Sequence, residues 1–354
     1  MTRQAACLKV PKTQGQKAID LANRLGLRDK QLVIGNDAIS VYVPLLRQPT
    51  AEEAAIFKNQ LDLQLDVCVF QERKGQENLQ EILKNTLPKH LVAILPRALD
   101  IVGDIAIVEI PPELKTHKTS IGAAILEAHK NVRTVLAKAG AVRGTHRLRE
   151  FDVIAGEHRT RTVHREFGCR YDVDVAKAYF SPRLSHEHQR VASLVQEGET
   201  IVDLFTGVGP FSVLIAKKHQ GVRVYAVDIN PEAFELLKKN ILLNRVENRV
   251  IPVLGEARQV VHDSLSGVAD RVIMNLPESA AEFVGSASQA LKPGGGVVHF
   301  YGFLRKNDSF EEMQHRFSEA VEKSGRRVEQ FLYAGTVRET APYECQVVLD
   351  VRVV

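Results

Sequence analysis

The second half of the sequence predicts an α/β fold built on a doubly wound, seven-stranded sheet. Strand-like and helix-like segments alternate from residue 200 onward, as they do when parallel strands are joined by crossover helices. A glycine-containing turn joins the first of these strands to the first helix, as in nucleotide-binding α/β folds. The last two strand-like segments have no helix between them, so we expect one strand to run antiparallel. The expected strands cover residues 200–204, 223–228, 249–254, 271–274, 297–303, 327–333 and 346–354.

Length and composition indicate a multidomain globular protein. The chain has 354 residues, enough for about two to three domains. Apolar residues make up 44% and charged residues 25%, which excludes collagen-like and disordered classes. The most apolar stretch, Leu91–Ile110, contains Arg97, Asp100 and Asp104, so we expect no transmembrane helix. The N-terminus has no apolar core of a secretory signal, and we therefore expect a cytoplasmic protein with no membrane partner.

The first 50 residues are expected to form a small α+β module. The spacing of apolar residues predicts an amphipathic helix over residues 16–25 that ends at Gly26. We expect strands over residues 6–10, 31–34 and 39–43. The boundary is expected near Thr50, which is suited to cap a following helix. The predicted domains are therefore residues 1–50, 51–180 and 181–354.

The middle region, residues 51–180, is expected to be an α+β domain with an antiparallel sheet. Residues 101–110 read as an interrupted strand, and apolar spacing predicts a helix over residues 119–139. Further strands are expected over residues 142–148, 151–155, 161–164 and 171–175. Between Lys115 and Arg170 there are 12 Lys/Arg and 5 Asp/Glu residues, a local excess of positive charge. Such a stretch suits a phosphate backbone, although a solvated surface is the alternative.

The four cysteines do not suggest a metal or disulfide framework. Cys7, Cys68, Cys169 and Cys345 are scattered, and no two have C-x-x-C spacing. We expect four free thiols and no bound metal.

The segment Val202–Phe211, VDLFTGVGPF, carries the most chemical information. Gly207 and Gly209 would let the backbone approach a ligand closely, but the loop lacks the third glycine of a dinucleotide fingerprint and the lysine of a P-loop. Asp203 stands just before the loop, where it could hold an ammonium group. Asp228 ends the next strand, 25 residues later, where a carboxylate can accept both ribose hydroxyls of a nucleoside.

This loop, together with Asp228, resembles that of the class I S-adenosylmethionine-dependent methyltransferases. The resemblance implies S-adenosylmethionine (SAM) as cofactor. It also implies that Glu256 stands where these enzymes often use Asp to bind the adenine amine. The implied cofactor contacts are His188, Asp203, Phe205, Gly207, Gly209, Asp228, Ile229, Glu256, Ala257 and Asn275.

Two further motifs narrow the resemblance. The fourth strand ends in Asn275-Leu-Pro277, a pattern typical of methyltransferases that act on a planar nitrogen. Upstream lie Gly144-Thr-His-Arg147 and Tyr179–Glu187, YFSPRLSHE. Together these motifs resemble the archaeal–eukaryotic tRNA guanine-37 N1-methyltransferases over nearly the whole chain. The family usually places Arg after the general base, and His188 stands there instead.

The family resemblance assigns roles to the matching residues. It implies Glu187 as the general base that removes the N1 proton of guanine, and Arg147 as the cation that stabilises charge on O6. Asn275 would orient the base, while Tyr179, Arg183 and Pro277 would contact the substrate. The middle domain would bind tRNA near the target, and the N-terminal module would contact the distant elbow. We expect a monomer.

Other functions remain open at this point. The nearest is a related enzyme of the wyosine pathway that transfers the aminocarboxypropyl group of SAM, which we expect to lack Asn275-Leu-Pro277. A methyltransferase that also modifies a carbon of the tricyclic wyosine intermediate is another. A non-catalytic RNA-binding module and a small-molecule methyltransferase are two more. Intact site residues argue against the non-catalytic module, and the two extra domains argue against the small-molecule enzyme.

Overall fold

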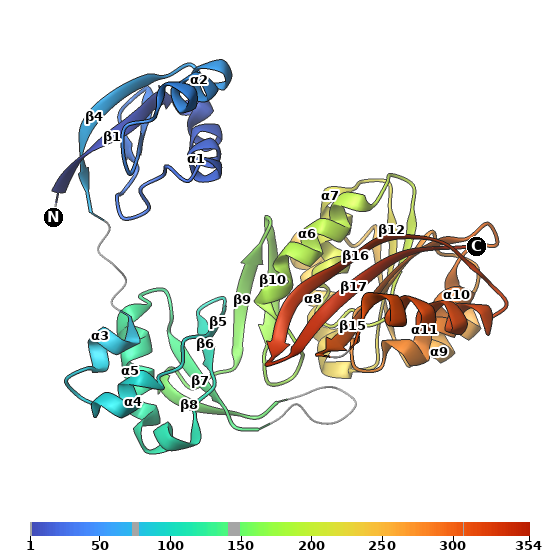
Figure 1. Ribbon diagram of the computed structural model, residues 1–354. Helices are drawn as coiled ribbons and strands as arrows, with labels where there is room; N and C mark the ends of the chain where they lie inside the picture. The colour runs from blue at the N-terminus through green and yellow to red at the C-terminus, as the bar shows by residue number, and fades with distance from the viewer. Residues whose placement is uncertain (1, 73–77, 141–148, 307) are drawn as a thin grey trace. The chain divides into compact units, whose positions relative to one another are not determined.

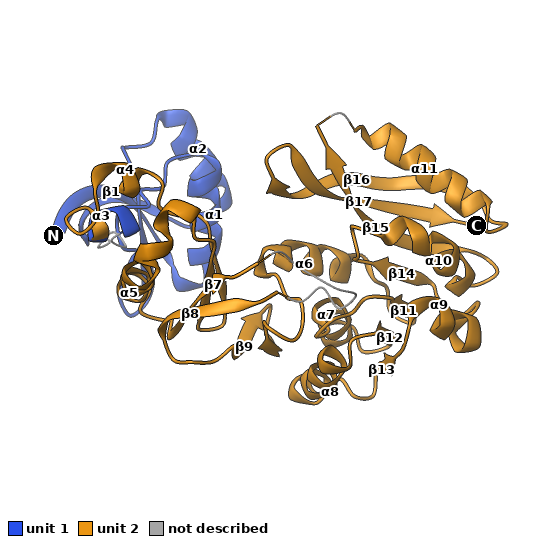
Figure 2. Ribbon diagram, turned by 90° about the horizontal axis from the view of Figure 1, so that it is seen from below, with its two compact units in different colours: residues 1–82 blue, residues 83–354 orange. Residues whose placement is uncertain are grey.

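The computed structural model describes residues 2–72, 78–140, 149–306 and 308–354. The chain forms two compact units, residues 1–82 and 83–354 (Figure 2). The predicted strand over residues 142–148 lies outside the described residues.

The first unit is larger than the predicted module. Its antiparallel sheet has the order β2-β3-β1-β4, and β1 and β4 lie side by side in Figure 1. The strands are β1 (Thr2–Pro11), β2 (Gly35–Asn36), β3 (Ser40–Pro44) and β4 (Gln64–Gln71), and the helices are α1 (Gly15–Arg24) and α2 (Ala51–Gln60). Thr50 caps α2 as predicted, through a reciprocal contact with Glu53. The boundary at residue 50 is nevertheless wrong, because β4 pairs along most of β1 and Phe57 of α2 lies in the core of this unit. The strand expected over residues 31–34 is also wrong, since pairing with β3 falls at β2 instead.

A four-stranded mixed sheet opens the second unit, with the order β5-β6-β7-β8. It consists of β5 (Leu99–Val102), β6 (Ile105–Val108), β7 (Thr134–Lys138) and β8 (Phe151–Gly156). Helix α5 (Lys118–Ala128) joins β6 to β7, which therefore run parallel. The helix predicted to reach residue 139 thus ends at Ala128, and Val135 and Leu136 are buried in a strand. The expectation of a purely antiparallel sheet is wrong for the same reason.

The hairpin of β9 (Arg161–Glu166) and β10 (Cys169–Asp174) packs with the C-terminal sheet. Asn240 and Asn244, one helical turn apart on α8 (Pro231–Asn244), bind the backbone of β10 along the edge that does not pair with β9. Asn240 accepts from the Asp172 amide at 2.6 Å and donates to its carbonyl at 3.1 Å, and Asn244 does the same for Arg170 at 2.9 and 2.7 Å. The sequence predicts this hairpin in the middle domain, before a boundary at residue 180. In the structure these contacts join it to the domain that follows that boundary.

The seven-stranded sheet is confirmed, with the order β13-β12-β11-β14-β15-β17-β16. Only β17 runs antiparallel to its neighbours, so the single reversed strand is also confirmed. The strands are β11 (Thr200–Asp203), β12 (Arg223–Asp228), β13 (Val250–Leu254), β14 (Arg271–Met274), β15 (Gly296–Arg305), β16 (Val328–Ala341) and β17 (Glu344–Val353).

Helices cover both faces of this sheet (Figures 1 and 2). One apolar core includes side chains of α6 (Ser185–Leu194), α7 (Pro210–Lys218) and α8, and the other those of α9 (Ala257–Val260), α10 (Val284–Ala290) and α11 (Phe310–Glu322). The strand order reverses between β11 and β14, so the carboxyl ends of these strands form the crevice where such folds bind ligands.

The remaining helical segments are short. They are α3 (Leu79–Leu83), α4 (Lys89–Ala93) and segments of one or two turns at Lys12–Gln14, Pro112–His117, Pro182–Leu184, Val261–Leu265 and Ala280–Phe283. In the described part of the chain, no helix combines the length and apolarity needed to cross a membrane.

Candidate active site

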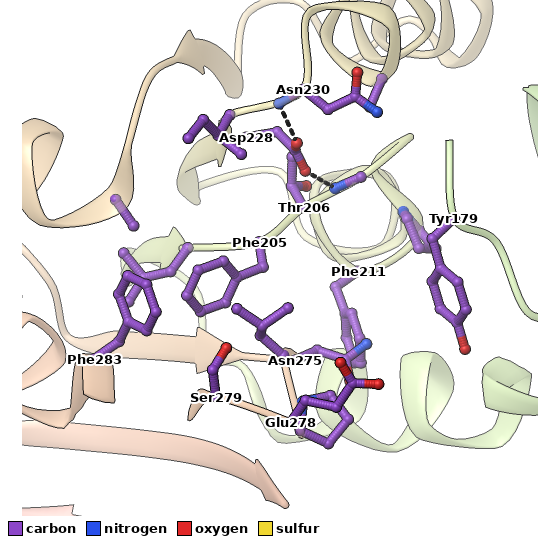
Figure 3. Close-up of a pocket in the computed structure, with 18 of the residues that line it drawn as sticks. Tyr179, Phe205, Thr206, Phe211, Asp228, Asn230, Asn275, Glu278, Ser279 and Phe283 are labelled. Carbon is purple, nitrogen blue, oxygen red and sulfur yellow. Dashed lines mark hydrogen bonds between the residues drawn. The ribbon is translucent and has the colours of Figure 1, made fainter. Parts of the chain in front are cut away.

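A cavity of about 550 Å³ lies at the carboxyl ends of β11, β12 and β14. Figure 3 shows the side chains that converge on it from the loops after these strands and from the segment before α6. Among the predicted site residues, those that line it are Tyr179, His188, Phe205, Gly207, Asp228, Ile229, Glu256, Ala257, Asn275 and Pro277. The sequence motifs therefore meet in one place.

The two loop glycines have different roles. Gly207 lines the cavity with φ 57°, and a Cβ there would meet only the Tyr179 carbonyl oxygen, at 3.6 Å. Gly209 is not among the lining residues. Its φ of 92° lets the chain enter α7, and a Cβ would come within 2.6 Å of Leu237. Only Gly207 thus meets the expectation of close backbone approach to a ligand.

Asp228 organises the loop beside it. Its Oδ2 accepts a hydrogen bond from the Gly207 amide at 2.6 Å, and its Oδ1 accepts from the Asn230 amide at 2.8 Å (Figure 3). Asn230 in turn caps α8 through the Glu232 amide at 3.0 Å. The carboxylate is therefore fixed at the cavity edge, where it was predicted to meet ribose hydroxyls.

Asp203 differs from its predicted position at the cavity surface. It is fully buried and accepts from the Ser212 hydroxyl of α7 at 2.8 Å. Burial raises its pKa to about 6, although hydrogen bonds from Ser212 and Thr206 oppose the shift. The side chain lies between β11 and α7, where its contact with Ser212 joins the end of the strand to the helix that follows the loop.

Aromatic side chains form one end of the cavity. Phe205 meets Phe283 edge-on with 4.9 Å between ring centroids, and the Arg258 guanidinium lies 4.2 Å from the Phe283 ring. Glu256 caps α9 by accepting from the Gln259 amide at 3.0 Å. A flat purine suits such a wall, as the predicted SAM cofactor requires. Phe283 was not predicted from the sequence, because it lies in an irregular turn with no motif.

His188 is buried against the same cavity. Its ring lies 4.6 Å from that of Phe211, and its Nδ1 lies 2.7 Å from Glu166 Oε1 on β9. The Nε2 atom is buried and has no hydrogen-bond partner among the described residues. An orphaned polar atom in a ligand cavity fits a polar cofactor group, so the predicted His188 contact stays open.

A hydrogen-bonded chain holds Asn275 from the far edge of the sheet. Gln346 Nε2 donates to Asn275 Oδ1 at 3.2 Å, and Arg338 donates to Gln346 Oε1 at 2.9 Å. Arg338 also donates to the Tyr179 and Ser181 hydroxyls at 2.9 and 2.8 Å. Sequence reasoning missed Arg338 and Gln346, because only the pairing of β16 with β17 brings them here.

Glu187 is close to the cavity but does not line it. In the first turn of α6 it is flanked by the lining residues Leu184 and His188. Arg190 Nε lies 3.0 Å from both its carboxylate oxygens, and the Tyr301 hydroxyl donates to Oε2 at 2.9 Å. The predicted general base is thus oriented by two side chains of the same domain.

The remaining predicted substrate residues lie elsewhere. Arg183 pairs with Asp100 at 2.5 Å and lines a neighbouring cavity of about 310 Å³, whose wall shares Tyr179 and Arg338 with the first. Arg147 lies outside the described residues. Within the described ranges no cluster of side chains could hold a metal, and the four cysteines are free.

The sequence matches known proteins of the family that its motifs resemble. Residues 162–329 match the model of the TRM5/TYW2 methyltransferase domain, and residues 79–160 match that of the TYW2 N-terminal domain. The tRNA (guanine(37)-N(1))-methyltransferase Trm5b of Pyrococcus abyssi is 46% identical over 267 residues, covering 75% of this chain and 78% of that protein. The tRNA(Phe) (4-demethylwyosine(37)-C(7)) aminocarboxypropyltransferase of Pyrococcus horikoshii is 32% identical over 275 residues, covering 78% of this chain and 96% of that protein.

The fold is also similar to that of a solved structure over nearly the whole chain. The crystal structure of Pyrococcus abyssi Trm5b superposes with a TM-score of 0.71 at 38% identity, covering 99% of both chains. Together with the cavity at the switch point, these matches establish that the chain belongs to the TRM5/TYW2 family of SAM-dependent methyltransferases.

Proposed function

We propose that this enzyme transfers the methyl group of SAM to N1 of guanosine at position 37 of tRNA. One observation carries the proposal: Asn275 and Pro277 line the same cavity as Asp228, at the switch point of the sheet. The motif predicted to face a planar nitrogen thus opens onto the predicted cofactor site. The 46% identity to a relative of that name supports the same reaction.

The cavity has the parts that such a reaction needs. Asp228 would accept the ribose hydroxyls of the cofactor, and Phe205 and Phe283 would pack against its adenine. SAM supplies an electrophilic methyl group. Asn275 uses its Oδ1 to accept from Gln346, which leaves its amide nitrogen to donate to an acceptor on the target base. A residue held in this way loses little entropy when it orients a substrate.

Glu187 would act as the general base. Guanine N1 keeps its proton at neutral pH, so a carboxylate must remove the proton as the methyl group transfers. Negative charge then develops toward O6, where Arg147 would stabilise it. Because Glu187 stands between two lining residues, a change of its side-chain torsions would bring it toward a bound base.

Exposed cations of the middle region would bind the tRNA backbone. Several of the cations counted there are already in ion pairs, including Lys118 with Asp152 and Arg161 with Asp172. Lys115, Lys130 and Arg165 are exposed and are better candidates for phosphate contacts. The target nucleotide would have to leave the anticodon-loop stack to enter the cavity.

A second candidate is aminocarboxypropyl transfer to a wyosine precursor. Two observations favour it: the match of residues 79–160 to the TYW2 N-terminal domain, and the Pyrococcus horikoshii relative. Asn275-Leu-Pro277 favours methyl transfer, because we expect the aminocarboxypropyl enzymes to lack it.

The test uses SAM labelled in the methyl group with two unmodified tRNA transcripts. One carries guanosine at position 37 and the other adenosine. We expect labelled 1-methylguanosine from the first transcript only. Label in neither transcript, or a different labelled nucleoside, would contradict the proposal. Carboxyl-labelled SAM with a tRNA that carries the tricyclic precursor then tests the second candidate.

A further inference from the structure

A chain of buried and half-buried titratable side chains leads from Glu187 into the centre of the sheet. It starts on α6, crosses β17, β15 and β14 in turn, and ends at the loop before β11. Its members, in order of contact, are Glu187, Arg190, Asp350, His299, Arg271 and Glu199. Only one of them, Glu187, stands beside the cavity, so the chain connects the predicted base to the interior of the domain.

Arg190 is shared between two carboxylates. Its Nε lies 3.0 Å from both oxygens of Glu187, while Nη1 and Nη2 lie 2.5 and 3.2 Å from the two oxygens of Asp350. The ring of Tyr333 on β16 lies 4.8 Å from the guanidinium and fixes its plane. Nη2 also lies 3.0 Å from Glu187 Oε2, so Asp350 is held by Nη1 and Nη2, and Glu187 by Nε and Nη2, of one guanidinium.

The hydrogen bonds assign the tautomer of His299. Arg271 Nη1 lies 2.8 Å from His299 Nε2, and a guanidinium can only donate. Nε2 must therefore accept, and Nδ1–H donates to Asp350 at 2.6 Å. His299 is thus neutral, in agreement with the lowering of its pKa by burial.

With His299 neutral, the chain holds three carboxylates and two guanidiniums. One negative charge is in excess. Glu199 binds Arg271 through both its oxygens, at 2.8 and 2.9 Å. Although burial opposes it, hydrogen bonds from His299 and Arg190 lower the pKa of Asp350 to about 2. Arg271 thus faces Glu199, and Arg190 faces both Asp350 and Glu187, of which only Glu187 stands beside the cavity.

We propose that Asp350 and Tyr301 are positioning residues that set the basicity of Glu187, a role that rests on the proposed function. Asp350 neutralises Arg190, so Glu187 can accept a proton without leaving an uncompensated buried cation. Tyr301 has the opposite effect on the basicity of Glu187. Its hydroxyl donates to Glu187 Oε2 and so stabilises the ionised carboxylate. In the reaction, guanine N1 gives its proton to Glu187 and its electron pair to the methyl carbon, and the electrons of the broken carbon–sulfur bond stay on sulfur.

The charged and titratable groups around Glu187 give opposite predictions for two substitutions. Arg190 contacts it from α6 and Tyr301 from β15, while Asp350 on β17 acts on it through Arg190, and His299 only through Asp350. Asp350→Asn removes a negative charge, so Arg190 acts on Glu187 alone and the carboxylate becomes less basic. Tyr301→Phe removes a donor to the ionised form, so the carboxylate becomes more basic.

The experiment measures single-turnover methylation of the guanosine-37 transcript from pH 5 to 9 at saturating SAM. We expect Asp350→Asn to shift the acid limb of the rate profile to lower pH by about one unit or more and to slow the plateau rate. We expect Tyr301→Phe to shift the same limb to higher pH. Matched controls are Asp270→Asn, an aspartate paired with Lys292, and Tyr225→Phe on β12, neither of which lines the cavity. Both controls should keep the wild-type limb.

The outcomes separate the inference from the proposed function. If wild type makes no 1-methylguanosine at any pH, the proposed function fails. If wild type is active, either of two results overturns the positioning role: the acid limbs of Asp350→Asn and Tyr301→Phe both stay in place, or both move in the same direction. Thermal unfolding and SAM titration identify a variant that does not fold. If Asp350→Asn is such a variant, Tyr301→Phe decides alone: an upward shift supports the role and an unmoved limb overturns it.

Discussion

The carboxylate of Asp228 accepts a hydrogen bond from the backbone amide of Gly207 at 2.6 Å. The residue at the end of β12 thereby holds the loop that follows β11, and both line the cavity. The conformation of this loop thus depends on the side chain that we propose binds the cofactor ribose. A second chain of contacts links Glu187, through Arg190, to the buried Asp350 of β17 and the neutral His299 of β15.

Replacing Asp228 by Ala removes the acceptor for two backbone amides and for the expected ribose hydroxyls. We expect SAM affinity to fall by about 10- to 100-fold, as when a hydrogen bond to a charged group is lost. Isothermal titration calorimetry measures the change. The control is Asp263→Ala, an aspartate of the turn after α9 that does not line the cavity. An Asp228→Ala protein that binds SAM as wild type does would refute the assignment.

Gln346→Leu tests the support of Asn275. Leu has a similar volume but cannot donate to Asn275 Oδ1, so the amide is free to rotate. We expect kcat to fall about 10-fold, the cost of one such hydrogen bond, while SAM affinity stays unchanged. Rapid-quench kinetics and calorimetry measure the two quantities. A loss of SAM affinity with unchanged kcat would place Gln346 in cofactor binding instead.

Asn240→Ala tests how the β9–β10 hairpin is held. The side chain satisfies the backbone of Asp172 and also donates to the Val208 carbonyl at 2.9 Å. Its removal leaves these buried groups unpaired, and we expect the free energy of unfolding to fall by about 1–3 kcal/mol. Urea denaturation followed by circular dichroism measures it. Asn248→Ala, at an exposed position after α8, is the control and should change stability little. An equal effect of both substitutions would contradict this account.

The buried Asp203 predicts a pH dependence of stability. Its pKa in the folded protein is raised to about 6 from an ordinary value of 3.8, so ionising it costs the folded state free energy. The cost is absent below about pH 4, grows as the pH rises to 6, and is constant above. Asp203→Asn abolishes it, so stability relative to wild type should rise across this window by roughly 3 kcal/mol. Denaturation at pH 4, 5, 6 and 7 measures the difference, and a flat difference would show that Asp203 ionises normally.

Local sequence signals predicted the elements that are specified locally. Helix α8 is such an element, because Asn230 caps its start and Arg245, with φ 58°, ends it. The helix expected over residues 119–139 is different. Its apolar spacing is compatible with a helix, but residues 134–138 are buried as a strand between β6 and β8, a pairing that depends on distant segments.

The site residues also divide into those that local sequence signals place and those that depend on distant segments. Asp228, Asn275 and Gly207 stand at strand ends, where the order of strands alone places them around the switch point. Arg338 reaches the site only through the pairing of β16 with β17, and no motif marks it. The sequence also does not indicate which way Asp203 points, because that depends on the packing of α7 against β11.

The most direct test of the account is methylation of the guanosine-37 transcript by wild type and by Glu187→Gln, with nucleoside analysis of the product. The account predicts 1-methylguanosine from wild type. It also predicts a single-turnover rate at least about 100-fold lower for Glu187→Gln at saturating SAM, with unchanged SAM affinity. A Glu187→Gln enzyme that forms 1-methylguanosine at the wild-type rate, or a wild-type product other than 1-methylguanosine, would contradict it.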